Sequence, residues 1–184
     1  LGRYKVKAVQ DRILQQNPYA HVDVHSNNIV DETDIFRAVC EDASLILCLT
    51  DENPSRILCT NIGIKTDTTV LYGRATQRAI SGDVLRFVPK KTPCIACVTG
   101  KGIFKGIEDE ISSTKHAKRV MPSYVNPNLE EEATIHVGLS ADVSPVANMI
   151  VKLALSELSN QSDQETGIGS LEEDFIANYF FWVN

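Results

Sequence analysis

The chain has 184 residues, of which 43% are hydrophobic and 23% charged, an ordinary composition for a globular domain with its own core. Its net charge of −6 argues against a nucleic-acid backbone or an anionic membrane surface as the main partner. No apolar run approaches the roughly 18 residues that a membrane-spanning helix needs, and the charged first ten residues do not resemble a signal peptide.

The first forty residues are predicted to form a helix, a short strand and a second helix. Residues 5–17 carry apolar side chains at helical spacing, and Pro18 ends this helix. Residues 22–25 alternate between apolar and polar side chains, which predicts a strand, and residues 35–42 have a helical pattern. Because a strand normally precedes the first helix of an α/β protein, we expect the first βαβ segment of the fold to precede residue 1.

The next thirty residues contain the most apolar strand of the chain. Residues 44–50 are nearly all apolar, as expected of a central parallel strand that is covered on both faces. A helix over residues 55–64 follows, and the β-branched residues of 68–73 predict the next strand. This alternation of helices and strands is typical of a doubly wound parallel sheet.

The pattern changes after residue 80. Residues 82–89 alternate, and residues 94–99 are interpreted as a short partner strand, which predicts antiparallel strands at the end of the sheet. Residues 140–158 have a broad apolar face and form the clearest helix. The predicted fold is therefore α/β, a Rossmann-like three-layer sheet that is mostly parallel, has antiparallel strands at its end and lacks the first βαβ segment.

One domain is expected, in three regions. Residues 1–100 hold most of the sheet, residues 101–134 form a mobile insertion or a crossover loop, and residues 135–184 add a C-terminal helix and a tail.

Asp51, Lys5 and Arg56 are the candidate nucleotide-binding residues. Asp51 directly follows the most apolar strand, and ligands of open α/β sheets bind at that edge, where a carboxylate can hold Mg²⁺ or orient phosphates. Asp51 could instead be the N-cap of the next helix, since caps of this kind are frequent. A lysine at a helix start, such as Lys5, is disfavoured by the helix dipole, so it either faces a phosphate or is an ordinary solvated side chain. Arg56 has the same two interpretations.

The five cysteines fit a cytoplasmic protein with reduced thiols better than a secreted disulfide framework. Cys94 and Cys97 form a Cys-x-x-Cys pair, which supplies two of the four ligands of a structural zinc site. A thioredoxin-type redox pair needs the start of a helix after a strand, which the flanking residues do not favour. The pair is therefore either half of a zinc site or two inert thiols. The sequence contains no Gly-x-Gly-x-x-Gly loop for phosphates.

The order of these features resembles the ThiF/MoeB-like family of ubiquitin-activating-type adenylyltransferases. The resemblance rests on five short motifs, which are weak singly but occur in the family's order: Gly2-Arg3-Tyr4-Lys5, a helix that ends at Asn17-Pro18, an apolar strand that ends at Asp51 with Arg56 shortly after, Gly82-Asp83-Val84, and Pro93-Cys94-Ile95-Ala96-Cys97. It covers residues 1–100 well and residues 135–158 loosely.

The resemblance implies ATP-dependent adenylation of the C-terminal glycine of a ubiquitin-like or sulfur-carrier protein, by a homodimer. By position, Lys5 would contact the ATP phosphates, and Asp51 would bind Mg²⁺ or the nucleotide. Arg56 would also belong to the nucleotide-binding residues. Cys94 and Cys97 would be two of four Zn²⁺ ligands.

The sequence departs from the family pattern in the parts that complete these sites. The glycine-rich loop and the ribose-binding carboxylate would precede residue 1, and the second Cys-x-x-Cys would follow residue 184. We therefore expect the 184 residues alone to be largely inactive. The alternatives are a non-catalytic binding or dimerisation module with the same fold, and an unrelated nucleotide-binding α/β segment.

Overall fold

The computed structural model describes residues 2–75, 81–100, 140–161 and 178–183. The chain divides into two compact units, Leu1–Ala38 and Val39–Asn184. The expected insertion at 101–134 lies outside the described residues. No helix in the described ranges is long and apolar enough to cross a membrane.

The first unit contains helix α1 (Lys5–Gln16), and helix α2 (Thr33–Cys40) begins in it. Both helices were predicted from apolar spacing, and α1 ends where Asn17-Pro18 was expected to stop it. The predicted strand at residues 22–25 is wrong, since these residues have no strand structure. A strand requires a neighbouring strand, and the Val22 carbonyl instead accepts a hydrogen bond of 2.7 Å from Gln10 Nε2 of α1.

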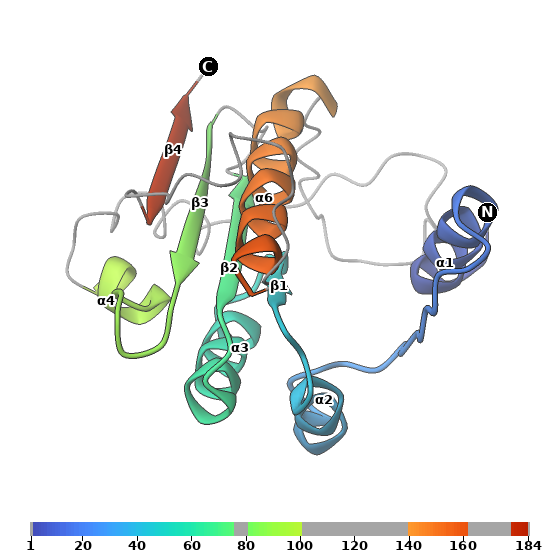
Figure 1. Cartoon of the computed structure of the whole chain (residues 1–184), viewed down its shortest axis with the longest axis horizontal. Helices are drawn as coiled ribbons and strands as arrows, with labels where there is room; N and C mark the ends of the chain where they lie inside the picture. The colour runs from blue at the N-terminus through green and yellow to red at the C-terminus, as the bar shows by residue number, and fades with distance from the viewer. Residues whose placement is uncertain (1, 76–80, 101–139, 162–177, 184) are drawn as a thin grey trace, which may run out of the picture. The chain divides into compact units, whose positions relative to one another are not determined.

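The second unit is built on a four-stranded sheet in the order β1-β2-β3-β4 (Figure 1). The strands are β1 (Ile46–Cys48), β2 (Val70–Ala75), β3 (Ser81–Phe87) and β4 (Tyr179–Val183). β1 and β2 are parallel, whereas β2–β3 and β3–β4 are antiparallel pairs. The predicted change from parallel to antiparallel pairing at the end of the sheet is confirmed. The helices of this unit are α3 (Asn53–Thr66), α4 (Ile95–Gly100) and α6 (Ser140–Asn160).

Helix α3 covers one face of the sheet. It is the crossover between the parallel strands β1 and β2, as the sequence predicts for a βαβ unit. Its contacts are close: the Thr60 hydroxyl lies 2.7 Å from the Tyr72 hydroxyl, and Gly63 leaves so little room that a Cβ there would lie 2.6 Å from Val70 Cγ2. Val70 and Tyr72 therefore point towards α3.

Helix α6 covers the opposite face. Side chains alternate along a strand, so Leu71 and Gly73 point away from α3 and towards α6. Leu71 and Val84 form one buried cluster with three residues that recur at helical spacing in α6, Val146, Ile150 and Leu153. The unit thus has the three layers of a Rossmann-like α/β fold, with its core on both sides of β2.

Two sequence-based details differ from the structure. Strand β1 was expected to be covered on both faces, but Leu47 and Leu49 are 47% and 59% exposed, because the α6 cluster is centred on β2 and β3 rather than on β1. Residues 94–99 were interpreted as a strand but form helix α4, where the Val98 N–H donates to the Cys94 carbonyl at 3.1 Å. Both edges of β3 are already occupied, by β2 and by β4, so a further strand has no edge of β3 to join.

Candidate functional site

Asp51 lies in the turn that joins β1 to α3, at the carboxyl end of a parallel strand. Its side chain is exposed, and within the described residues it makes no hydrogen bond or ion pair. The N-cap of α3 is Glu52, without a side-chain capping bond, so Asp51 does not have the capping role that was the alternative interpretation. An exposed carboxylate at this edge remains available to a ligand.

The buried side chain of Arg56 stabilises the backbone of this turn. The residue is 3% exposed, and its Nε and Nη2 atoms donate to the Thr50 carbonyl oxygen at 3.1 and 2.8 Å. Its Nη1 atom donates to Asn53 Oδ1 at 3.0 Å. The guanidinium therefore ties the residue before Asp51 to the first residue of α3.

A second set of bonds reinforces the turn. The Ser55 hydroxyl lies 2.6 Å from Thr50 Oγ1 and 2.7 Å from the Glu52 carbonyl oxygen. The residues on either side of Asp51, Thr50 and Glu52, are thus both held by hydrogen bonds. Asp51 also lies beside the N-terminus of a 14-residue helix, where the helix dipole favours anions such as phosphate. Sequence reasoning missed Thr50 and Ser55, whose roles rest on a backbone carbonyl and a short hydroxyl contact.

Lys5 is the first residue of α1, as predicted, and its side chain is exposed. The backbone reaches this helix through Gly2, whose φ of 89° is a conformation that other residues rarely adopt. The neighbouring Arg3 forms an ion pair with Asp11, and Lys7 donates to Gln10, whereas the Lys5 amino group contacts no acidic side chain of the described chain. Lys5 belongs to the first unit, and Asp51 and Arg56 to the second.

Cys94 and Cys97 lie side by side at the start of α4, with 3.6 Å between their sulfur atoms. Two sulfurs that each bind a tetrahedral zinc at about 2.3 Å would be about 3.8 Å apart, so the pair fits one edge of such a site. No group of three or more potential metal ligands occurs among the residues that the structure describes. The sequence argument that this pair does not begin a helix after a strand is wrong, since α4 is the next element after β3 and begins at Ile95.

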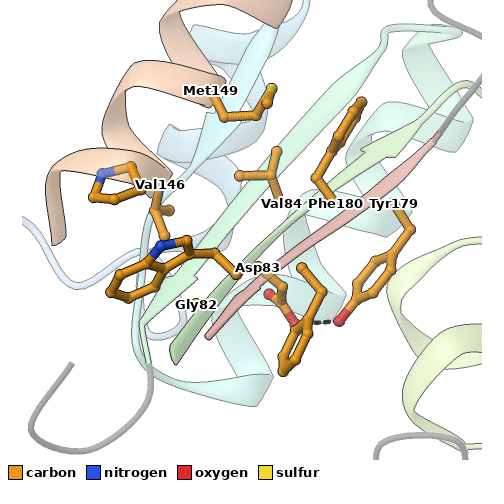
Figure 2. Close-up of a pocket in the computed structure, with 10 residues that line it drawn as sticks. Gly82, Asp83, Val84, Val146, Met149, Tyr179 and Phe180 are labelled. Atoms are coloured by element: carbon orange, nitrogen blue, oxygen red, sulfur yellow. Dashed lines mark hydrogen bonds between the residues drawn. The ribbon is translucent and has the colours of Figure 1, made fainter. Parts of the chain in front are cut away.

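A buried charge network that joins β2, β3 and β4 was not predicted. Asp83 of β3 accepts hydrogen bonds from Arg74 Nε at 2.7 Å and Arg74 Nη2 at 2.5 Å, and both side chains are at most 4% exposed. The Tyr179 hydroxyl of β4 donates to the same carboxylate at 2.7 Å (Figure 2). Burial, and then this hydrogen bond, raise the pKa of Tyr179. The sequence signal was available, because the alternation of β3 puts Asp83 on the same face as Leu85 and Phe87.

An apolar pocket of about 450 Å³ lies beside this network, between β3, β4 and the first half of α6. Figure 2 shows Val146 and Met149 of α6 facing Phe180 of β4 across Val84. Gly82 pairs with both Ala75 and Trp182, and β2 runs parallel to β1. The pocket therefore lies at the end of the sheet at which β1 reaches Asp51.

Comparison with known proteins agrees with this architecture. The model of the ThiF family matches residues 1–175. The protein called ubiquitin-like modifier-activating enzyme 5 is 23% identical over 189 residues in Caenorhabditis briggsae and 24% identical over 186 residues in Caenorhabditis elegans. These alignments cover 97% and 95% of this chain, but only 39% and 40% of the relatives, so the chain spans about two fifths of their length.

Solved structures show the same fold at low sequence identity. The E. coli protein MccB, in a crystal structure with ATP, has a TM-score of 0.60 and 13% identity, covering 88% of this chain and 42% of MccB. The protein PaaA has a TM-score of 0.55 and 18% identity, covering 83% of this chain and 47% of PaaA.

Proposed function

Since this chain belongs to the ThiF family, we propose that the protein adenylates the C-terminal glycine of a ubiquitin-like or sulfur-carrier protein with ATP. The observation that carries the proposal is the exposed Asp51 carboxylate, which stands without a protein partner in the described chain at the carboxyl end of β1. The relatives named as ubiquitin-like modifier-activating enzymes, and the MccB structure with ATP, support the class of reaction.

In this reaction the carrier's terminal carboxylate attacks the α-phosphorus, an acyl–phosphate bond forms, and pyrophosphate leaves. When bound, Mg²⁺-ATP supplies the adenylyl group. We assign Asp51 to hold the cation that accompanies the phosphates, because carboxylate oxygens are the ligands that Mg²⁺ prefers. Lys5 would place an ammonium group on the phosphates, where it offsets the negative charge that develops as pyrophosphate leaves.

Arg56 acts through its neighbours in this proposal. The sequence placed it among the nucleotide-binding residues, and its buried guanidinium is bonded to the Thr50 carbonyl and to Asn53. We therefore propose that Arg56 positions Asp51 by fixing the turn on both sides of it. A lysine at this position could not make the same forked contacts, because its ammonium is a single point of charge.

We also propose that Cys94 and Cys97 contribute two ligands to a structural zinc site and that the protein is a cytoplasmic homodimer. Their 3.6 Å separation is compatible with such a site, whose remaining ligands would come from outside the described residues. Elemental analysis of the whole protein should find about one zinc per chain, and Cys94→Ser should lower that content. A stable whole protein without zinc contradicts this part of the proposal.

The adenylation proposal is tested in the whole protein by ATP–pyrophosphate exchange with its carrier. Asp51→Ala should abolish exchange, whereas Asp67→Ala should not, since Asp67 is an exposed aspartate at the opposite end of α3 that pairs with Lys90. Exchange that persists in Asp51→Ala refutes the role of Asp51. A wild-type protein that exchanges no pyrophosphate in the presence of ubiquitin-like or sulfur-carrier proteins refutes the function itself.

The second candidate function is a non-catalytic binding or dimerisation module. The exposure of Leu47 in β1 and of Leu49 just after it favours this function, because apolar side chains in a parallel sheet are normally covered. Leu47→Asp in the whole protein separates the two functions. Loss of self-association together with absent exchange in the wild type supports the module, whereas exchange in the wild type supports the enzyme.

A further inference from the structure

Cys94 and Cys97 form a pair of thiols whose sulfur atoms are in contact. The Cys94 thiol donates a hydrogen bond of 3.6 Å to the Cys97 sulfur, and neither residue belongs to a disulfide. The two sulfurs of a disulfide are about 2.05 Å apart, so a bond between this pair requires a further approach of about 1.5 Å. Rotation of the two side chains about their Cα–Cβ bonds can supply an approach of that size.

The backbone holds the two cysteines at this separation. The Val98 N–H donates to the Cys94 carbonyl oxygen at 3.1 Å, which closes one helical turn around the pair. Ile95, which lies between the two cysteines in the sequence, is 3% exposed and anchors this turn in the core. Little chain entropy is therefore lost when a bond joins the two sulfurs, because the ring that closes is short and already ordered.

The five cysteines of the chain differ in their access to solvent. Cys97 is exposed and Cys94 is partly exposed, whereas Cys40, Cys48 and Cys59 are buried. A small oxidant in solution therefore reaches Cys97 first, where a second thiol is already in contact with the first. The sequence-based objection to a redox pair was that no strand leads into a helix at this motif. The structure removes that objection, because α4 is the next element after β3.

We propose that Cys94 and Cys97 form a reversible disulfide when the protein meets a peroxide. In its thiolate form, Cys97 attacks one oxygen of hydrogen peroxide; the O–O bond breaks, Cys97 becomes a sulfenic acid, and the second oxygen leaves as hydroxide. The Cys94 sulfur then attacks the Cys97 sulfur, the S–O bond breaks, and water leaves with the Cys94 proton. Two thiols are thereby oxidised to one disulfide while one peroxide is reduced to two waters. A dithiol such as dithiothreitol reverses the change by exchange.

This chemistry is independent of the adenylation proposal, and it competes with the proposed zinc site for the same two sulfurs. Zinc binds cysteine as the thiolate, and the sulfurs of a disulfide carry no such charge. The oxidised pair therefore cannot hold zinc, and bound zinc shields the pair from peroxide. The Cys-x-x-Cys motif then has two exclusive states, a reduced state that accepts a metal and an oxidised state that does not.

The test uses the whole wild-type protein in two arms, one with a metal chelator and one with excess zinc. In each arm the folded protein is treated with hydrogen peroxide, its remaining thiols are alkylated under denaturing conditions, and it is digested with trypsin without reduction. Cleavage after Lys91 and Lys101 releases residues 92–101, which contain Cys94 and Cys97 but no other cysteine. The peptides with the three buried cysteines serve as the internal control.

In the chelator arm, the peptide of residues 92–101 should carry no alkyl group and be two hydrogens lighter than its reduced form. Dithiothreitol before alkylation should restore both alkyl groups. The free thiols of the 184 residues should fall from five to three, since the buried cysteines stay reduced. A peptide that keeps both alkyl groups, or a sulfinic acid at Cys97 beside an alkylated Cys94, overturns the proposal.

A variant and the zinc arm separate the parts of the inference. In Cys94→Ser the sulfenic acid at Cys97 has no thiol partner and should be trapped by dimedone, whereas a variant without any dimedone adduct refutes the assigned order of attack. In the zinc arm the disulfide should form more slowly than in the chelator arm. Equal rates in the two arms refute the zinc site and leave the disulfide standing.

Discussion

Replacing Asp83 with asparagine removes the negative charge from the buried network while keeping the size of the side chain. Arg74 would then hold a guanidinium at 3% side-chain exposure without its counter-charge. Breaking one partner of a buried ion pair costs about 3–5 kcal/mol, because the remaining charge is desolvated and uncompensated. Asparagine can still accept a hydrogen bond from Arg74 or Tyr179, so we expect a loss of unfolding free energy of about 3 kcal/mol for Asp83→Asn.

The matched control is Asp67→Asn. Asp67 also pairs with a cation, Lys90 at 3.1 Å, but the two side chains are 63% and 76% exposed. Exposed pairs contribute at most about 1 kcal/mol, so the control should be close to wild type. Tyr179→Phe removes one hydrogen bond to the carboxylate and should cost about 1–2 kcal/mol, between the other two variants.

The assay is urea unfolding followed by the fluorescence of Trp182, the single tryptophan of the chain, which lies in β4, the strand that also carries Tyr179. The double variant Arg74→Met with Asp83→Leu should recover much of the loss, because it removes both charges together. If Asp83→Asn costs no more than Asp67→Asn, or if the double variant loses the sum of the single losses, the network does not contain an ion pair that stabilises the packing of β2 on β3.

Two further predictions concern packing and pH. Gly82→Ala should lower the free energy of unfolding by about 1–3 kcal/mol, since its Cβ would lie 2.3 Å from Val146 Cγ2. In Gly73→Ala the added Cβ would lie 3.0 Å from its nearest neighbour, a methyl group of the exposed Leu49 side chain, so this variant should lose less stability in the same urea experiment. Equal losses for the two variants would contradict the reasoning. Burial raises the pKa of Tyr72, so its neutral form stabilises the fold fully below the unfolded value of about 10 and loses this effect as pH rises above it. Stability measured across that range should fall less steeply in Tyr72→Phe than in wild type, and parallel curves would argue against a buried, neutral Tyr72.

Local pattern and composition were sufficient for most of the elements before residue 90 and for α6. The helices α1, α2, α3 and α6 and the strand β3 were predicted from the spacing of their apolar residues. The strand β1 was predicted from a continuous apolar run, and β2 from its β-branched residues. The position of Asp51 at the carboxyl end of a strand followed in the same way, since chain order alone places a residue after a strand. The family was likewise accessible from short motifs in a fixed order.

Pairing between distant segments was decided only by the tertiary structure. Residues 22–25 have the alternation of a strand but pair with no strand in the described chain, and residues 94–99 form α4 because both edges of β3 are taken. Strand β4, nearly a hundred residues after β3 along the chain, takes the second edge, and with it Tyr179 reaches Asp83.

The same distinction applies within the candidate site. The sequence identified Asp51 and Arg56 as functional residues, but it could not say that Arg56 is buried and bonded to the Thr50 carbonyl. It also could not bring the Thr60 hydroxyl to within 2.7 Å of the Tyr72 hydroxyl, which depends on how α3 packs on β2. A sequence sets the period and the charge of each segment, whereas the partner of each edge and each buried polar group is chosen by packing among segments that are remote in the chain.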